Sequence, residues 1–219
     1  MRLWVLLLLL WVPCFAWADD ATELDLGHQM APLFEKDKTI SRDLRVLAPL
    51  QAMVDRMAPA TGRALPYRIE GIVQSEQVNA MTLPGGHIYV YQGLLDMGLS
   101  RDQMAGVLGH EMAHAALSHG YKRLREASAA RRLGHRLHGF NTLNALLLDG
   151  VGRRYEYQAD AYGTRYATAA GYDPAGLLEA LQRIQHLETV RPGVMARLLA
   201  THPPTAERID RLKTQLKSR

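Results

Sequence analysis

The segment that most constrains this chain is a His-Glu-x-x-His pattern inside a predicted helix. It contains His110, Glu111 and His114, and residues 101–117 include no proline and repeat apolar side chains at helical spacing. Ser100 stands where an N-cap is expected, with a glutamine three residues later, as in a capping box. The pattern therefore predicts a helix that begins just after Ser100 and carries both histidines.

Residues four apart on a helix lie on one face, so His110 and His114 can share one metal ion. Glu111 is rotated by about 100° from His110, so it is a poor third ligand but can reach a water beside the metal. Zinc hydrolases need such a set: imidazole ligands, an open coordination position and a carboxylate base. The alternative is an ordinary helix with two histidines. Against it, Gly106 and Gly109 indicate that another backbone approaches closely.

A second predicted helix can supply the missing ligand. It extends from residue 153 to Gly171 and carries Glu156 and Asp160 on one face. Glu156 can be a carboxylate ligand, and Asp160 can accept a hydrogen bond from the far nitrogen of a ligand histidine, fixing its tautomer. The alternative is an exposed helix with ordinary ion pairs. His119 would lie about 140° from His114 on a continuous helix, so we interpret it as a structural or capping histidine.

The remaining patterns predict an α+β fold, mainly α, with a small antiparallel sheet beside the His-Glu-x-x-His helix. Residues 19–60 favour helix, and residues 65–92 favour short strands separated by a Pro-Gly-Gly turn. Further helices are expected from residue 175 to 190 and at the C-terminus. An edge of the sheet could hold an extended peptide through main-chain hydrogen bonds.

The first 18 residues predict a secretory signal peptide: Arg2, an apolar stretch of about ten residues, and a small-x-small site ending at Ala18. An uncleaved anchor is the alternative, but the stretch is short for a span of about twenty residues. Cleavage would remove Cys14, the only cysteine, and leave 19–219 as a single domain without disulfides. Losing Arg2 lowers the formal net charge from +4 to +3, too small to indicate nucleic-acid binding.

Residues 121–149 begin strongly basic and end apolar. They fit either a solvated helix face or a segment that contacts anionic lipid or covers the active-site cleft. The apolar part, residues 141–149, is too short to span a bilayer. Peripheral membrane contact through 121–149 is therefore one expectation.

Four ordered blocks extend over roughly residues 30–215. They are Asn79-Ala80-Met81 with Leu83-Pro84-Gly85-Gly86, then Gly109-His110-Glu111-Met112-Ala113-His114, then Arg154-Tyr155-Glu156-Tyr157-Gln158-Ala159-Asp160, and finally Thr201-His202-Pro203-Pro204-Thr205. Together they resemble the zinc metallopeptidases of the CAAX prenyl protease and HtpX type, and most of all their periplasmic, BepA-like branch. The chain departs from these relatives because it lacks multiple membrane spans and ends soon after the last block. Prenylated substrates and docking through helical repeats are therefore not expected.

The resemblance implies a gluzincin-like metallopeptidase domain that holds one zinc ion per chain. The metal ligands would be His110, His114 and Glu156, with Glu111 as the catalytic base.

The resemblance also implies that Asn79, Ala80 and Met81 line the substrate cleft and that His202, on a loop stiffened by two prolines, faces the metal. Two roles for His202 remain open. It could stabilise the oxyanion of the tetrahedral intermediate, or it could occupy the fourth zinc position and silence the resting enzyme.

Together, these observations predict a periplasmic zinc endopeptidase that acts on polypeptides. The expected substrates are misfolded or unassembled envelope proteins, and the expected role is protein quality control. A zinc-containing, chaperone-like protein that binds clients and rarely cleaves them is the alternative. A purely structural zinc is a third hypothesis. Such sites are usually closed and rich in cysteine, and the mature chain would have none.

Overall fold

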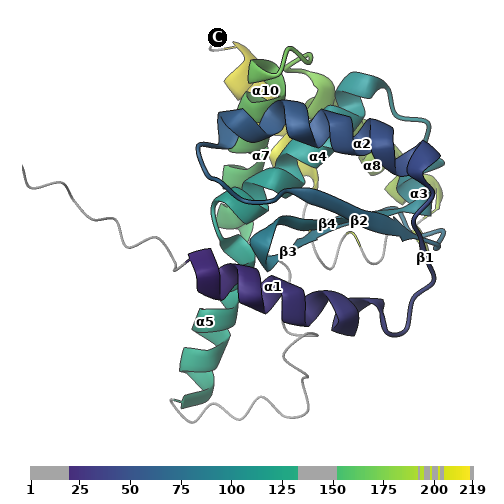
Figure 1. Cartoon of the computed structure of the whole chain (residues 1–219). Helices are drawn as coiled ribbons and strands as arrows, with labels where there is room; N and C mark the ends of the chain where they lie inside the picture. The colour runs from purple at the N-terminus through teal and green to yellow at the C-terminus, as the bar shows by residue number, and fades with distance from the viewer. Residues whose placement is uncertain are drawn as a thin grey trace, which may run out of the picture.

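The computed structural model describes residues 20–132, 152–191, 193–194, 198, 202 and 205–217. The predicted signal peptide, the apolar run at 141–149 and the two prolines after His202 lie outside the described residues. The described part is mainly helical with one small sheet, which confirms the α+β, mainly α prediction (Figure 1).

The elements follow one another along the chain in a helix-sheet-helix order. They are α1 (Asp20–Glu35), β1 (Ile40–Ser41), α2 (Leu44–Met57), η1 (Ala58–Thr61), β2 (Arg68–Val73), β3 (Ala80–Leu83), η2 (Pro84–Gly86), β4 (His87–Tyr91), α3 (Gln92–Leu95), α4 (Arg101–Ala116), α5 (His119–Arg132), α7 (Arg153–Ala169), α8 (Gly176–Val190) and α10 (Thr205–Lys217).

The predicted His-Glu-x-x-His helix is α4, and it is the centre of the structure. Its first turn is fixed by the expected capping box: the Gln103 backbone N–H donates to Ser100 Oγ at 3.2 Å, and the Ser100 N–H donates to Gln103 Oε1 at 3.0 Å. Every residue from Met104 to Ala116 is buried. A helix that is covered on all sides belongs to the core, so His110 and His114 are carried on a rigid element.

The sheet has the order β1-β2-β4-β3 and is mixed. β3 and β4 form an antiparallel pair around the Pro-Gly-Gly turn, but β2 runs parallel to β4. The prediction of a wholly antiparallel sheet is therefore wrong. Alternating side chains indicate which face each residue occupies, but they do not indicate which strand edges pair. The connection between β2 and β4, residues 74–86, is long enough for a parallel crossover.

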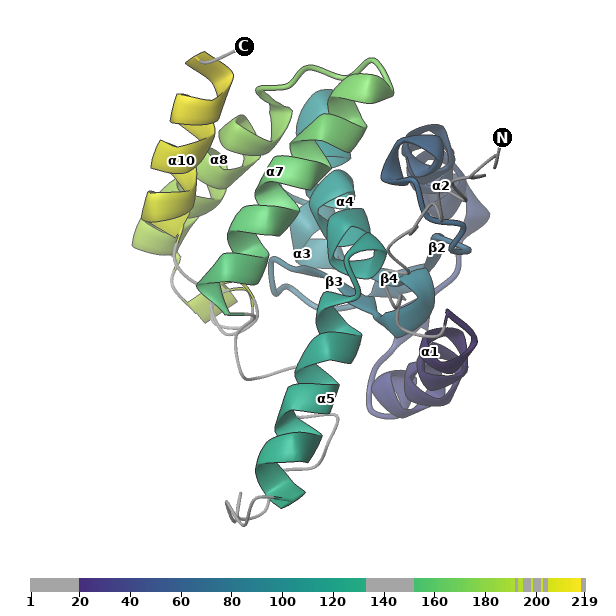
Figure 2. The same cartoon turned by 90° about the vertical axis from the view of Figure 1, so that its left-hand side faces the viewer.

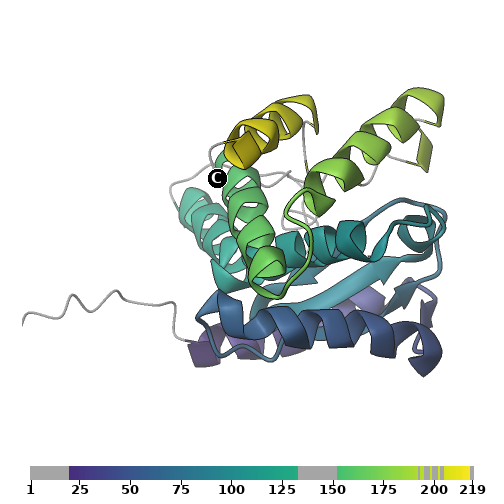
Figure 3. The same ribbon diagram turned by 90° about the horizontal axis from the view of Figure 1, so that it is seen from above.

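Helices cover both faces of the sheet (Figure 1). On one face α1 packs through Phe34 against Tyr89, with ring centroids 4.5 Å apart. On the other face α2 and α4 share one apolar core with Ile88 and Val90. Helices α7 and α8 then lie against α4, and α10 packs on α7 and α8 (Figures 2 and 3). No helix in the described part of the chain is both long and apolar enough to cross a bilayer.

Helix α4 touches α7 and α8 almost backbone to backbone. A Cβ placed on Gly109 would lie 2.7 Å from the carbonyl oxygen of Gly163, and one placed on Gly106 would lie 2.5 Å from the nitrogen of Leu177. The close approach predicted from the two α4 glycines is confirmed. It brings α7, which carries Glu156, directly beside the two histidines.

Candidate metal centre

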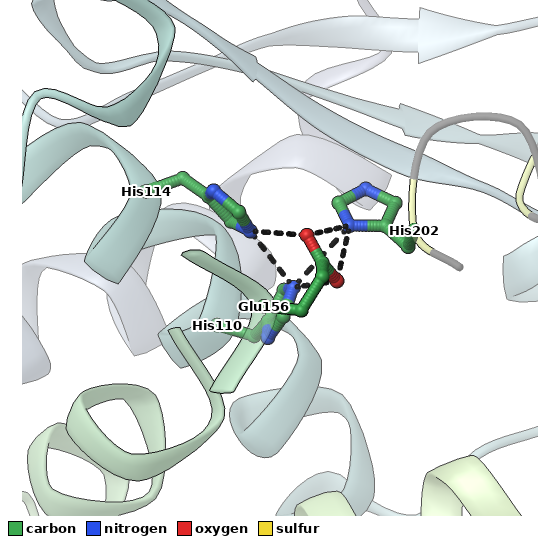
Figure 4. Close-up of side chains that lie close together, drawn as sticks. All are labelled: His110, His114, Glu156 and His202. Atoms are coloured by element: carbon green, nitrogen blue, oxygen red, sulfur yellow. Dashed lines mark hydrogen bonds and ion pairs between the residues drawn. The ribbon is translucent and has the colours of Figure 1, made fainter. Parts of the chain in front are cut away.

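Four buried side chains from three parts of the chain meet beside α4. Helix α4 supplies His110 and His114, α7 supplies Glu156, and His202 lies between α8 and α10. Their potential ligand atoms all lie within 4.8 Å of one another, and the four side chains point to a common centre (Figure 4). The structure thus brings together the three predicted ligands and His202.

The distances within the cluster suit a shared cation. The Nε2 atoms of His110 and His114 are 3.0 Å apart, and Glu156 Oε1 lies 3.3 Å from His114 Nε2. His202 Nδ1 lies 3.1 Å from Glu156 Oε2. Imidazole nitrogens and a carboxylate oxygen are the donors that zinc and similar divalent transition metals take, so the residues fit such an ion.

Asp160 and Arg208 form a second layer around His110. Asp160 Oδ1 lies 2.9 Å from His110 Nδ1, so His110 turns its Nε2 to the cluster, as predicted. Arg208 donates to both oxygens of Asp160, at 2.8 and 2.6 Å, and contacts Glu156 Oε2 at 3.0 Å. Arg208 is not among the site residues predicted from the sequence. The available signal was its place on the apolar face of α10, next to Ile209 and four residues before Leu212.

The charges of this layer are set by opposing effects. Burial raises the pKa of Asp160, but Arg208 outweighs it and lowers that pKa to about 2. Burial likewise opposes ionisation of Glu156, yet His202 and Arg208 hold its pKa well below the ordinary value. Burial and Arg208 disfavour a charged His110, but its bonds to Asp160 and Glu156 raise its pKa to about 9. The carboxylates of Asp160 and Glu156 are therefore ionised at neutral pH. A cation that binds here must compete with the proton on His110.

Glu111 lies beside the cluster and outside it. Its Oε1 is 3.5 Å from His202 Nε2. The Thr82 hydroxyl, on β3, lies 3.0 Å from Glu111 Oε2 and 3.1 Å from the Glu111 carbonyl oxygen. The carboxylate is thus held next to the predicted ligands without joining their cluster, which suits a group that accepts a proton there.

Comparison with known proteins agrees with this geometry. Residues 46–216, more than half of the chain, match Peptidase family M48. The chain belongs to this family.

Relatives in the family include enzymes from bacteria and mitochondria. Mitochondrial metalloendopeptidase OMA1 of Saccharomyces cerevisiae is 31% identical over 149 residues, which cover 63% of this chain and 43% of that protein. Metalloprotease LoiP of Escherichia coli is 28% identical over 189 residues, 78% of this chain and 73% of LoiP. Metalloprotease YcaL of Escherichia coli is 24% identical over 210 residues, 90% of this chain and 76% of YcaL. The chain thus spans less than half of the yeast protein.

In this M48 chain, His119 lies against His114, one of the predicted ligands. Helix α4 ends at Ala116, and α5 begins at His119 in a new direction, so the angle expected for a continuous helix does not apply. His119 Nδ1 is 3.1 Å from His114 Nδ1, and its Nε2 is 3.1 Å from Gln158 Oε1. Burial and His114 lower the pKa of His119 to about 2, so it is neutral. It is a structural histidine rather than a ligand.

The predicted cleft residues divide between the two faces of the sheet. Asn79 and Ala80 line an apolar pocket next to His110 and Glu111. The other lining residues are Leu94, Val107, Leu177, Leu181, Ile184, Leu198, His202 and Arg208. The side chain of Met81 instead joins the core under α1, so it does not line this pocket.

Proposed function

We propose that this chain is a zinc-dependent endopeptidase that hydrolyses peptide bonds. The observation that carries the proposal is the buried cluster of His110, His114 and Glu156 with the Glu111 carboxylate held beside it. The names of the relatives, metalloendopeptidase and metalloprotease, support the same activity.

Metal binding, proton transfer and orientation of the base are carried by different residues. His110, His114 and Glu156 would hold zinc, which supplies Lewis acidity by polarising a carbonyl and making water more acidic. Glu111 takes the proton from the attacking water and passes it to the leaving amine. The hydroxyl of Thr82 keeps the carboxylate of Glu111 oriented during both transfers.

The substrate is an extended polypeptide segment. β3 is the outermost strand of the described sheet and lies next to α4, so its free edge can pair with a peptide backbone. One apolar side chain of that peptide would enter the pocket that Leu181 and Ile184 line beside Glu111. Replacing Ile184 with alanine should widen the pocket and shift the cleavage preference toward larger apolar residues, measured with a peptide library. Leu187→Ala, at a half-buried position outside the pocket lining, is the matched control.

His202 is proposed to occupy the fourth ligand position in the resting enzyme. Its Nδ1 faces the ligand cluster, with 3.4 Å to His110 Nε2. Two described residues that precede it contact the same region: the Val194 carbonyl oxygen accepts a hydrogen bond from the Val78 backbone N–H at 3.0 Å, and Leu198 lines the apolar pocket. A substrate would have to displace this arrangement. Replacing His202 with alanine should then speed cleavage, whereas slower cleavage with metal retained would instead assign His202 to the oxyanion.

The biological setting is also part of the proposal. The predicted signal peptide supports a periplasmic location, where misfolded or unassembled envelope proteins would be the substrates, and within the family the chain would belong to the BepA-like branch. Helix α5 projects away from the body and exposes Lys122 and Arg125, which supports peripheral contact with anionic lipid at residues 121–149 (Figures 1 and 2). No nucleic-acid partner is proposed.

Glu111→Gln separates the enzyme from the chaperone-like alternative. The variant keeps the size of the side chain but cannot take a proton. It should retain zinc and bind unfolded casein while losing casein cleavage. Survival of the cellular function in Glu111→Gln would favour the chaperone-like protein.

A further inference from the structure

A tight turn between α4 and α5 places His119 against His114 of the candidate metal centre. Ser118, between α4 and α5, has φ of +55°, a left-handed conformation that is uncommon outside glycine. Its buried hydroxyl donates to Glu23 Oε2 at 2.8 Å and accepts from Arg63 Nη1 at 2.7 Å. Arg63 also donates to the carbonyl oxygen of Ala115 near the end of α4, at 3.0 Å. The change of direction is therefore fixed by buried charged groups, and His119 lies 1% exposed.

The hydrogen bonds beyond this turn form a line with one self-consistent direction. His114 must present an unprotonated Nε2 to bind a metal, so its single proton lies on Nδ1. That N–H can donate only if His119 Nδ1 accepts, at 3.1 Å, which leaves the proton of His119 on Nε2. This second N–H donates to the side-chain amide oxygen of Gln158, Oε1, at 3.1 Å, an atom that can only accept.

We propose that His119 and Gln158 are positioning residues that hold His114 in the tautomer able to bind the metal. Asp160 fixes the tautomer of His110 in the same way, by accepting a hydrogen bond from its Nδ1 at 2.9 Å. The two ligand histidines therefore have different partners: a carboxylate for His110 and a neutral imidazole–amide pair for His114. The stacking of His119 on Tyr155, with centroids 4.5 Å apart and rings 25° from parallel, keeps the imidazole in the plane that the line requires.

Zinc affinity is the direct readout, measured by competition with a chromophoric chelator. His119→Phe keeps a ring against Tyr155 but has no nitrogen, and Gln158→Leu removes the acceptor at nearly constant volume. Both should weaken zinc binding by about 10- to 100-fold, the usual effect of losing such a partner. Gln158→Glu keeps an acceptor oxygen and should stay close to wild type. His186→Phe, at an exposed histidine on α8, is the matched control.

The tautomer itself can be observed by ¹⁵N NMR of the histidine rings in the zinc-free protein. Wild-type His114 should be protonated at Nδ1, and Gln158→Leu should populate both tautomers. If His119→Phe does not fold, the comparison of Gln158→Leu with Gln158→Glu still tests the proposal. The proposed role of His119 and Gln158 would be overturned by equal zinc affinities for Gln158→Leu and Gln158→Glu, or by a mixture of His114 tautomers in the wild type. Because the readout is metal affinity, either result is separate from the fate of the proposed peptidase activity.

Discussion

Replacing Gly163 with alanine should push apart the two helices that build the metal centre. The added Cβ would lie 2.5 Å from the backbone nitrogen of His110 and 2.7 Å from the carbonyl carbon of Gly109. Both neighbours are backbone atoms that cannot rotate away, so α4 and α7 must separate by roughly 1 Å to restore ordinary contact distances. Overpacking of this kind costs about 1–3 kcal/mol. Because both contacts are with rigid backbone, the cost lies near the upper end of that range, about 3 kcal/mol. Alanine returns about 1 kcal/mol of helix propensity, so the expected net loss is roughly 2 kcal/mol.

Urea unfolding of the chelator-treated protein measures this loss without a contribution from zinc. A loss of that size lowers the melting temperature by roughly 4–8 °C in a protein of this length. Zinc affinity should fall as well, because Glu156 moves away from both histidines. Gly120→Ala is the matched control: its Cβ would meet the nearest atom, Pro84 Cγ, at an ordinary 3.6 Å. A Gly163→Ala protein as stable as the control, with unchanged zinc affinity, would refute the proposed role of the glycine contact.

Two further changes test the groups around the ligands. Arg208→Gln removes the cation between Glu156 and Asp160, and leaving buried carboxylates without it should lower the free energy of unfolding by about 3–5 kcal/mol, measured with denaturant. An unfolding free energy equal to wild type would show that the carboxylates need no counter-charge. Thr82→Val removes the hydroxyl that contacts Glu111 and should lower kcat about tenfold or more with little change in KM, while Thr82→Ser restores most of the rate. A change in KM alone would place Thr82 in substrate binding instead.

Local patterns predicted the elements of the metal centre well. The apolar spacing and the capping box indicated α4, and two glycines indicated its close contact with a second backbone. The four-residue spacing of Glu156 and Asp160 indicated that both face the same way. These properties depend on residues near one another in sequence, so they can be predicted without knowing the fold.

Features that depend on tertiary pairing were not predictable in the same way. Strand periodicity could not indicate that β2 runs parallel to β4, because pairing partners are a property of the assembled sheet. The angle calculated for His119 assumed a helix that instead ends at Ala116, where Ser118 adopts a left-handed conformation. Arg208 resembled a surface charge on a basic helix, and only the assembled core shows that it lies 3% exposed between two carboxylates.

Metal content measured together with peptidase activity tests the central claim most directly. The chain from Asp19 onward, purified and analysed by elemental mass spectrometry, should hold one zinc ion and cleave casein. Chelator treatment should remove both the zinc and the activity. Added zinc should restore both in the wild type, whereas Glu111→Gln should bind zinc again and remain inactive. A wild-type chain that binds no zinc, or a Glu111→Gln variant that cleaves as fast as the wild type, would contradict the account.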